Sequence, residues 1–168
     1  NYARKTSANI NAGNPPDITM MGWIKVTDIS DYSYLCSIAT GSDGMGIAVH
    51  ASSSANGGKA YFYDNQQSSL VHEKGINDGE WHHICGVREC SSNRKLIYVD
   101  GVRGSSVQYP SNADYTDLDT IAVGHWCETS GTGLNYHCRG SLALVKIGLT
   151  GLTDEQVKKI YEDEKKLF

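Results

Sequence analysis

The sequence predicts an all-β protein in which two antiparallel sheets pack as a jelly-roll sandwich, with one short α-helix at the C-terminus. Three observations support this prediction. Short apolar runs recur along the 168 residues and are separated by turn residues, a spacing typical of sandwiches. Gly (18) far outnumbers Pro (3), which favours many tight turns. A helical pattern occurs only near the end, and the length suits a single domain over residues 1–168.

Each predicted strand is bounded by turn residues. Residues 18–26 are apolar on both faces, so we expect this strand inside a sheet that is covered on both sides. Asp100-Gly101 stands between Val99 and Val102, which is a strong hairpin signal because both turn positions need positive φ. The other strands are predicted at 34–39, 45–50, 60–63, 69–72, 80–88, 95–99, 120–124 and 140–147.

The C-terminal helix is predicted from its first residues. Thr153 and Gln156 have the spacing of a capping box, in which each side chain bonds the backbone N–H of the other residue. Apolar side chains follow at helical spacing. No Gly or Pro stop signal ends the helix, so we expect Leu167 and Phe168 to reach past the sheet toward another chain or domain. Sequence beyond Phe168 would then drive oligomerisation. The apolar stripe consists of Val157, Ile160, Tyr161 and Leu167.

Composition argues against two classes of partner. The net charge is −4 and there is no basic block, which makes nucleic acid a poor candidate. No apolar run approaches the length of a membrane span, so membrane insertion is not expected. The sequence opens on Asn1 without a signal peptide, so we interpret it as a mature fragment or an excised domain.

Several segments resemble laminin G-like domains in their order and spacing. They are residues 18–26, residues 80–84 followed by 96–102, and residues 139–147 followed by 152–156. Residues 32–40 and 83–85 are also similar to pentraxins. Both groups belong to the concanavalin A-like lectin/glucanase superfamily. The resemblance implies a jelly roll with Trp81 buried in its core, and a recognition or assembly module whose partner is a cell-surface glycan or another cell-surface ligand.

Two pentraxin features are not matched. Pentraxins pair the Cys of their second motif, here Cys85, with a Cys on the opening strand, where this chain has Met21. We therefore expect Cys85 to be a small buried apolar residue without that disulfide. Residues 125–138 lack the clustered acids and amides of the pentraxin calcium loop, so the resemblance does not extend to calcium-dependent binding of that kind.

The last residues carry a further resemblance. Residues 163–168 are similar to the end of laminin G-like modules in phage tail and fibre proteins. This implies a virion structural protein, located in the virion or outside the cell, with an adjacent virion protein or domain as a partner. A secreted microbial carbohydrate-binding or adhesin module is the alternative.

A missing motif argues against an enzyme. Glycosidases of this fold present Glu-x-Asp-x-x-Glu on one strand, which places the acid and the nucleophile about 5 Å apart. No predicted strand has this pattern, and the acid cluster 162–164 falls on the predicted helix. A glycoside hydrolase is therefore the least favoured of the three hypotheses.

His82 and His83 are adjacent on a predicted strand. Adjacent strand residues point to opposite faces, so the two side chains do not jointly hold a metal ion. We interpret both as packed structural residues.

The loop at 124–138 holds the candidate ligand-binding residues. An exposed aromatic ring suits the C–H face of a pyranose, and polar neighbours would bind its hydroxyls. The alternative is that the Trp of this loop plugs the end of the sandwich. The candidates are Trp126, Tyr136, His125 and Asn135.

Cys127 and Cys138 of the same loop have three interpretations. A disulfide between them would stabilise the fold by roughly 3 kcal/mol. A zinc site would use His125, Cys127, His137 and Cys138, but the last two are adjacent, which is unusual ligand spacing. Two unpaired thiols are the third interpretation. With five cysteines in the chain, at least one thiol is unpaired or pairs with another chain.

A structural calcium ion is the one cofactor that the sequence suggests. Calcium prefers carboxylate and carbonyl oxygens, and acids near predicted turns supply them. Ordinary turn acids are the alternative at each position. The candidates are Asp17, Asp114, Asp117 and Asp119.

Overall fold

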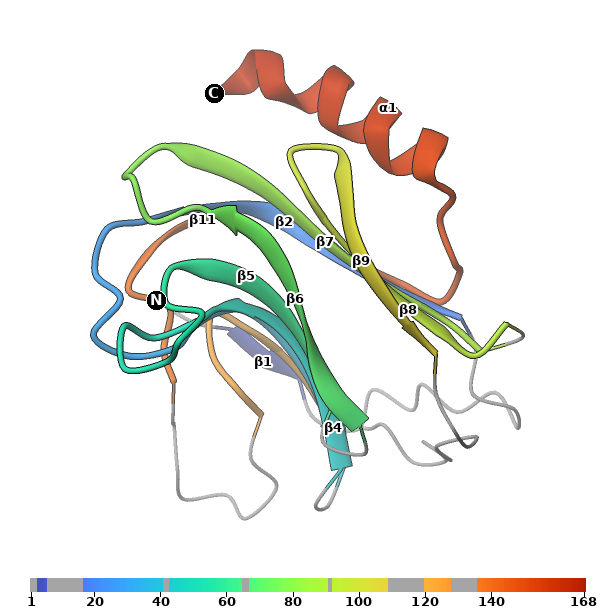
Figure 1. Cartoon of the computed structure of the whole chain (residues 1–168), viewed down its shortest axis with the longest axis horizontal. Coiled ribbons are helices and arrows are strands. Elements are labelled where there is room, and N and C mark those ends of the chain that lie inside the picture. The colour runs from blue at the N-terminus through green and yellow to red at the C-terminus, as the bar shows by residue number, and fades with distance from the viewer. Residues whose placement is uncertain are drawn as a thin grey trace.

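The computed structural model describes residues 3–5, 17–40, 43–64, 67–90, 92–108, 120–127 and 136–168. They form two antiparallel sheets packed face to face, with one helix on the outer face of one sheet (Figure 1). The predicted sandwich with a short C-terminal helix is therefore confirmed. No helix in the described ranges is long and apolar enough to cross a membrane.

The first sheet has six strands in the order β1-β10-β3-β4-β5-β6. The sequence does not predict β1, because Ala-Arg-Lys shows no apolar alternation; its three residues pair with the edge of β10. The bounds are β1 (Ala3–Lys5), β3 (Ser33–Thr40), β4 (Asp43–Val49), β5 (Lys59–Asp64), β6 (Gln67–Gly75) and β10 (Thr120–Val123).

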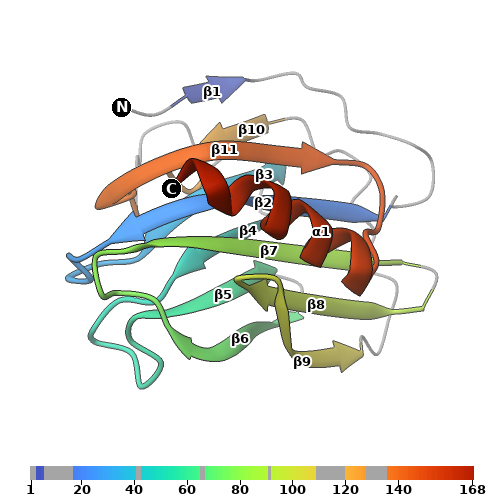
Figure 2. The same ribbon diagram turned by 90° about the horizontal axis from the view of Figure 1, so that it is seen from above.

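The second sheet has five strands in the order β11-β2-β7-β8-β9. Figure 2 shows the helix lying across this sheet. The Asp100-Gly101 turn joins β8 to β9 with positive φ at both residues, 51° and 74°, as predicted. The bounds are β2 (Ile18–Val26), β7 (Trp81–Glu89), β8 (Arg94–Val99), β9 (Val102–Gln108) and β11 (Gly140–Gly148).

The main core lies between the two sheets. Alternate residues of the central strands supply it, including Met45, Ile47 and Val49 of β4 and Ala60 and Phe62 of β5. The residues between them in sequence face away from the other sheet. This alternation decides which side chains of β4 and β5 are available to a ligand.

The helix covers the outer face of the five-stranded sheet. It begins with the predicted capping box, in which Thr153 accepts a hydrogen bond from the Gln156 N–H and Gln156 accepts one from the Thr153 N–H. Val157 is buried against Met21 and Cys85. Strand β2 is thus covered on both faces, as its sequence predicted. The helix is α1 (Asp154–Glu164) and continues into a 3-10 turn, η1 (Lys165–Leu167).

The end of the helix corrects one expectation. Phe168 does not reach past the sheet: its ring centroid lies 4.5 Å from that of Trp23 and 4.8 Å from that of Trp81. After the 3-10 turn, the Phe168 ring lies back against Trp23 of β2 and Trp81 of β7. Leu167 is 69% exposed.

Trp81 is a second correction. It was expected in the core, but it opens β7 at the rim of the sheet and is partly exposed. The buried tryptophan is Trp23 on the neighbouring strand, which is 2% exposed. Both lie under the helical segment, but only Trp23 is covered by α1 as well as by Phe168.

Met21 and Cys85 are register partners on β2 and β7. Their pairing supports the sequence comparison that placed Met21 opposite Cys85. Cys85 is fully buried in the cluster beneath the helix and is a thiol. The expectation of a small buried apolar residue is therefore confirmed.

His82 and His83 occupy opposite faces of β7, as predicted. The His83 ring lies beneath the helix, 5.5 Å from the Trp23 ring, and burial lowers its pKa to about 4. His82 instead binds Asp100, with 2.8 Å between Nδ1 and Oδ2. Lys74 of β6 donates to the same carboxylate at 2.6 Å, so this cluster ties the two sheets together.

This cluster gives the protein a pH-dependent element. The hydrogen bond to Asp100 raises the pKa of His82, and this outweighs the opposite effect of burial. Burial raises the pKa of Asp100, but hydrogen bonds from His82 and Lys74 outweigh it and lower the value to about 2. Protonated His82 is therefore bound more tightly in the folded state than in the unfolded chain.

We expect the stability advantage of the wild type over His82→Gln to depend on pH. His82 contributes fully below its unfolded pKa of about 6.5, and its contribution is lost as the pH rises through its higher folded value. Urea unfolding of both proteins at pH 5, 6, 7 and 8 measures the difference, which should shrink above about pH 6.5. The lowered pKa of His83 acts in the opposite direction but is common to both proteins. A difference that stayed constant over this range would contradict the assignment.

Candidate functional site

A cavity of about 240 Å³ opens on the outer face of the six-stranded sheet. Tyr61 and Tyr63 of β5 and Tyr34 of β3 stand on this face, while β4 between them presents the small residues Gly46 and Ala48. A Cβ at position 46 would lie 2.9 Å from Cε1 of Tyr34. Small residues on the central strand and large rings on its neighbours therefore make the hollow.

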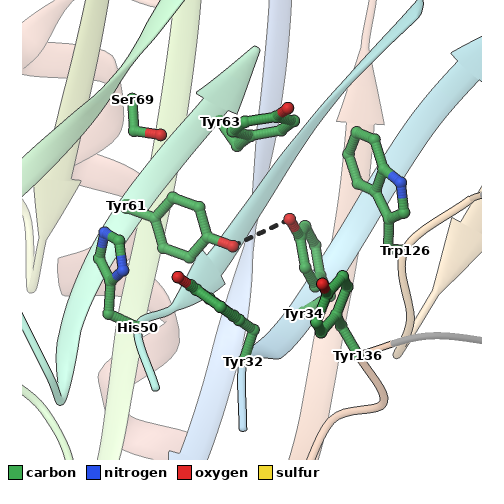
Figure 3. Close-up of a pocket in the computed structure, with 8 residues that line it drawn as sticks. All are labelled: Tyr32, Tyr34, His50, Tyr61, Tyr63, Ser69, Trp126 and Tyr136. Carbon is green, nitrogen blue, oxygen red and sulfur yellow. Dashed lines mark hydrogen bonds between the residues drawn. The ribbon is translucent and has the colours of Figure 1, made fainter. Parts of the chain in front are cut away.

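Loop residues complete the walls of this aromatic pocket (Figure 3). Tyr32 precedes β3 and His50 follows β4, while Trp126 and Tyr136 come from the segment after β10. The described residues that line it are Tyr32, Tyr34, His50, Tyr61, Tyr63, Ser69, Trp126 and Tyr136.

The rings are held by mutual packing. Tyr34 contacts Trp126 at a centroid distance of 5.3 Å, and Tyr63 meets Trp126 edge-on at 5.2 Å. Tyr32 meets Tyr61 and Tyr136 edge-on at 5.6 and 5.4 Å. Such edge-to-face pairs add to the stability of burial, so much of the pocket is formed before any ligand arrives.

Two buried hydroxyls meet in the pocket. The Tyr61 hydroxyl donates to the Tyr34 hydroxyl at 2.9 Å. Burial raises the pKa of both phenols far above the ordinary value, so neither carries charge near neutral pH. Tyr34 keeps its own proton to donate.

His50 is the unusual member of the lining. It is 8% exposed, and its ring lies 4.1 Å from that of Tyr61. Neither ring nitrogen has a hydrogen-bond partner in the described structure. Burial, together with nearby Lys59, lowers its pKa, so the ring is neutral near pH 7 and offers one donor and one acceptor. A buried polar group left without a partner costs about 1–3 kcal/mol.

The candidate residues of the loop at 124–138 do not all lie in the pocket. Trp126 and Tyr136 both line the pocket, and Tyr136 is 39% exposed. Trp126 is therefore not an internal plug of the sandwich. His125 does not line the pocket: it is 1% exposed, and its Nδ1 lies 2.8 Å from the Trp126 carbonyl oxygen. Asn135 lies outside the described residues.

The two loop cysteines are thiols in the structure. The Cys127 N–H donates to the Ser37 hydroxyl at 2.9 Å, and its sulfur lies 3.7 Å from the Ser37 carbonyl oxygen. Cys138 packs at the edge of the main core. The disulfide is therefore not formed here, because each sulfur has a different neighbourhood.

The metal candidates do not assemble among the residues that the structure describes. No group of three or more His, Cys, Asp or Glu side chains there could hold an ion, so the zinc set of His125, Cys127, His137 and Cys138 does not come together. Asp17 accepts the Cys90 N–H at 2.7 Å, which is a structural role. Asp114, Asp117 and Asp119 lie outside the described residues.

Most of the pocket is not predicted from the sequence. The available signal is the spacing of Tyr61 and Tyr63, since residues two apart on a strand share a face. Which face they share depends on the pairing of β3, β4 and β5. His50 gives no signal of its own, because its place in the pocket follows from the fold.

Several solved structures share this fold at low sequence identity. The carbohydrate-binding module CBM40 of Ruminococcus gnavus IT-sialidase, which has been solved with α2,3-sialyllactose, aligns with a TM-score of 0.71 and 12% identity over 95% of this chain and 98% of that chain. The SAP-like pentraxin of Limulus polyphemus aligns with a TM-score of 0.68 and 18% identity, over 95% of this chain and 75% of that chain. The binding domain of botulinum neurotoxin serotype D aligns with a TM-score of 0.66 and 15% identity, over 98% of this chain and 42% of that chain.

At these identities the likeness concerns the fold. The comparison with curated proteins found no match. A laminin G family model, described as "Concanavalin A-like lectin/glucanases superfamily", matches residues 1–158. The chain, whose outer sheet face carries the aromatic pocket, therefore belongs to this superfamily.

Proposed function

We propose that this domain is a non-enzymatic recognition module that binds glycan in the aromatic pocket. The observation that supports this most is the lining itself, in which six aromatic rings and a neutral, partnerless His50 surround one cavity. Aromatic faces pack against the C–H faces of sugars, while phenol, hydroxyl and imidazole groups bind sugar hydroxyls.

The volume of the pocket fits a small ligand or one residue of a larger one. Pockets for drug-sized ligands span roughly 300–1,000 Å³, and this one is about 240 Å³. It suits one sugar ring, with the rest of a glycan lying along the sheet outside it. The carbohydrate-binding module from Ruminococcus gnavus, which has the same fold, gives this proposal a precedent.

The lining does not suit hydrolysis. Glycosidases need two carboxyl groups at the scissile bond, and no Asp or Glu is among the described residues that line the pocket. This agrees with the missing Glu-x-Asp-x-x-Glu motif. A glycoside hydrolase therefore remains the least favoured alternative.

For the biological setting we propose a phage-type virion structural protein, placed in the virion or outside the cell. The resemblance of residues 163–168 to phage tail and fibre modules supports it, and an adjacent virion protein or domain would then be a second partner. A secreted microbial carbohydrate-binding or adhesin module is the alternative. Flanking sequence discriminates the two: a fibre segment supports the first and a signal peptide supports the second.

A glycan array with and without calcium tests the function. We expect binding to at least one glycan on the array, and the same signal in EDTA if the pocket alone makes the site. Loss of binding in EDTA would support the structural calcium suggested by the acids near predicted turns. Failure to bind any glycan, or release of reducing sugar from a bound glycan at enzymatic rates, would overturn the proposal.

A further inference from the structure

The charges around the aromatic pocket point to the class of glycan that it takes. Every described lining residue is a Tyr, Trp, Ser or His, so none carries a formal charge when the His is neutral. Burial keeps Tyr34 and Tyr61 protonated and keeps His50 neutral. Lys59 acts on His50 electrostatically but is not part of the lining.

An acidic sugar is poorly accommodated by such walls. A carboxylate or sulfate that leaves water needs a cation or several N–H donors in return. The lining offers no Lys or Arg among the described residues, and the faces of its rings carry the negative side of the aromatic quadrupole. An anion pressed against those faces would be repelled as well as desolvated.

An uncharged sugar meets complementary groups. Its hydroxyls both donate and accept, as do the Tyr34 and Tyr61 hydroxyls and the two nitrogens of neutral His50. A simple quaternary ammonium would also suit the ring faces, but it would leave the His50 nitrogens without partners. The unpaired imidazole thus favours a hydroxylated ligand.

We propose that the pocket selects an uncharged sugar residue and discriminates against acidic sugars such as sialic acid. This inference rests on the proposed glycan-binding function and adds its specificity. The proposed selectivity would distinguish this chain from the Ruminococcus gnavus module of the same fold, which has been solved with sialyllactose.

Matched glycan pairs test the selectivity. The probes are lactose against α2,3-sialyllactose, and N-acetyllactosamine against its 6-sulfate, titrated calorimetrically or on the array. For any other neutral glycan that binds, oxidation of a primary hydroxyl to the carboxylate gives the acidic partner. We expect the neutral member to bind at least about tenfold more tightly, the factor that corresponds to 1.4 kcal/mol.

A gain-of-function variant makes the test independent of lost folding. Ser69 lines the pocket and is exposed, so Ser69→Lys adds a cation at the rim. We expect it to raise the affinity for the acidic member, relative to that for the neutral member, about threefold or more at low salt, with the gain fading at high salt. Ser141→Lys makes the same change at an exposed position on β11 of the other sheet and should alter neither.

The outcomes separate the two proposals. No binding to any glycan would refute the glycan-binding function. Equal or tighter binding of the acidic member to the wild type would refute the selectivity and leave the function standing. Saturable binding of tetramethylammonium chloride in the pocket, with no neutral sugar bound, would refute both in favour of a cation cage.

Discussion

Replacing Trp23 with Ala is expected to lower the free energy of unfolding by about 3–5 kcal/mol, the usual cost of removing a buried Trp. The Trp23 ring is 2% exposed and stacks on Tyr161 and Phe168 at centroid distances of 5.7 and 4.5 Å. Its indole N–H donates to Glu164 Oε2 at 2.8 Å. The substitution removes the surface on which the C-terminal segment packs as well as its hydrogen bond.

The melting temperature measures this effect. For a domain of this size we expect a decrease of about 6–20 °C, since 1 kcal/mol corresponds to about 2–4 °C. Trp81→Ala is the matched control, because it removes the same side chain from a partly exposed rim position, where about 1 kcal/mol is typical. Equal losses for the two variants, or a larger loss for Trp81→Ala, would show that the helix does not bury Trp23 as described.

Replacing Trp126 with Ala is expected to weaken glycan binding by about tenfold or more. A central Trp of a binding site commonly contributes 2 kcal/mol or more, and 1.4 kcal/mol corresponds to tenfold. Trp126 forms one wall of the pocket and also supports Tyr34 and Tyr63. Its loss would remove a stacking surface and loosen two others.

Titration of the strongest glycan from the array measures this change. Trp81→Ala again serves as the control, because it lies on the other sheet, outside the pocket lining, and should keep the wild-type affinity. Melting curves of both variants separate a local loss of binding from unfolding. Unchanged affinity in folded Trp126→Ala would place the glycan elsewhere on the domain.

Those features of the fold that depend on the conformational preferences of neighbouring residues could be predicted from the sequence. Alternating apolar residues and turn signals defined most of the strands, and the Asp100-Gly101 hairpin and the Thr153–Gln156 capping box were predicted correctly. Each of these depends on the conformational preferences of a few neighbouring residues. The predicted placement of Met21 opposite Cys85 was supported by their pairing across β2 and β7.

The site depended on contacts between residues far apart in the sequence. Trp126 and Tyr136 were identified as candidates, but their partners Tyr34, Tyr61 and His50 became visible only when β3, β4 and β5 lay side by side. Likewise, the choice between Trp23 and Trp81 as the buried ring depended on where the chain turns after Glu164. Amino-acid type specifies that a ring will be buried or will stack, whereas the packing of distant segments decides which ring is buried and which remains open to a ligand.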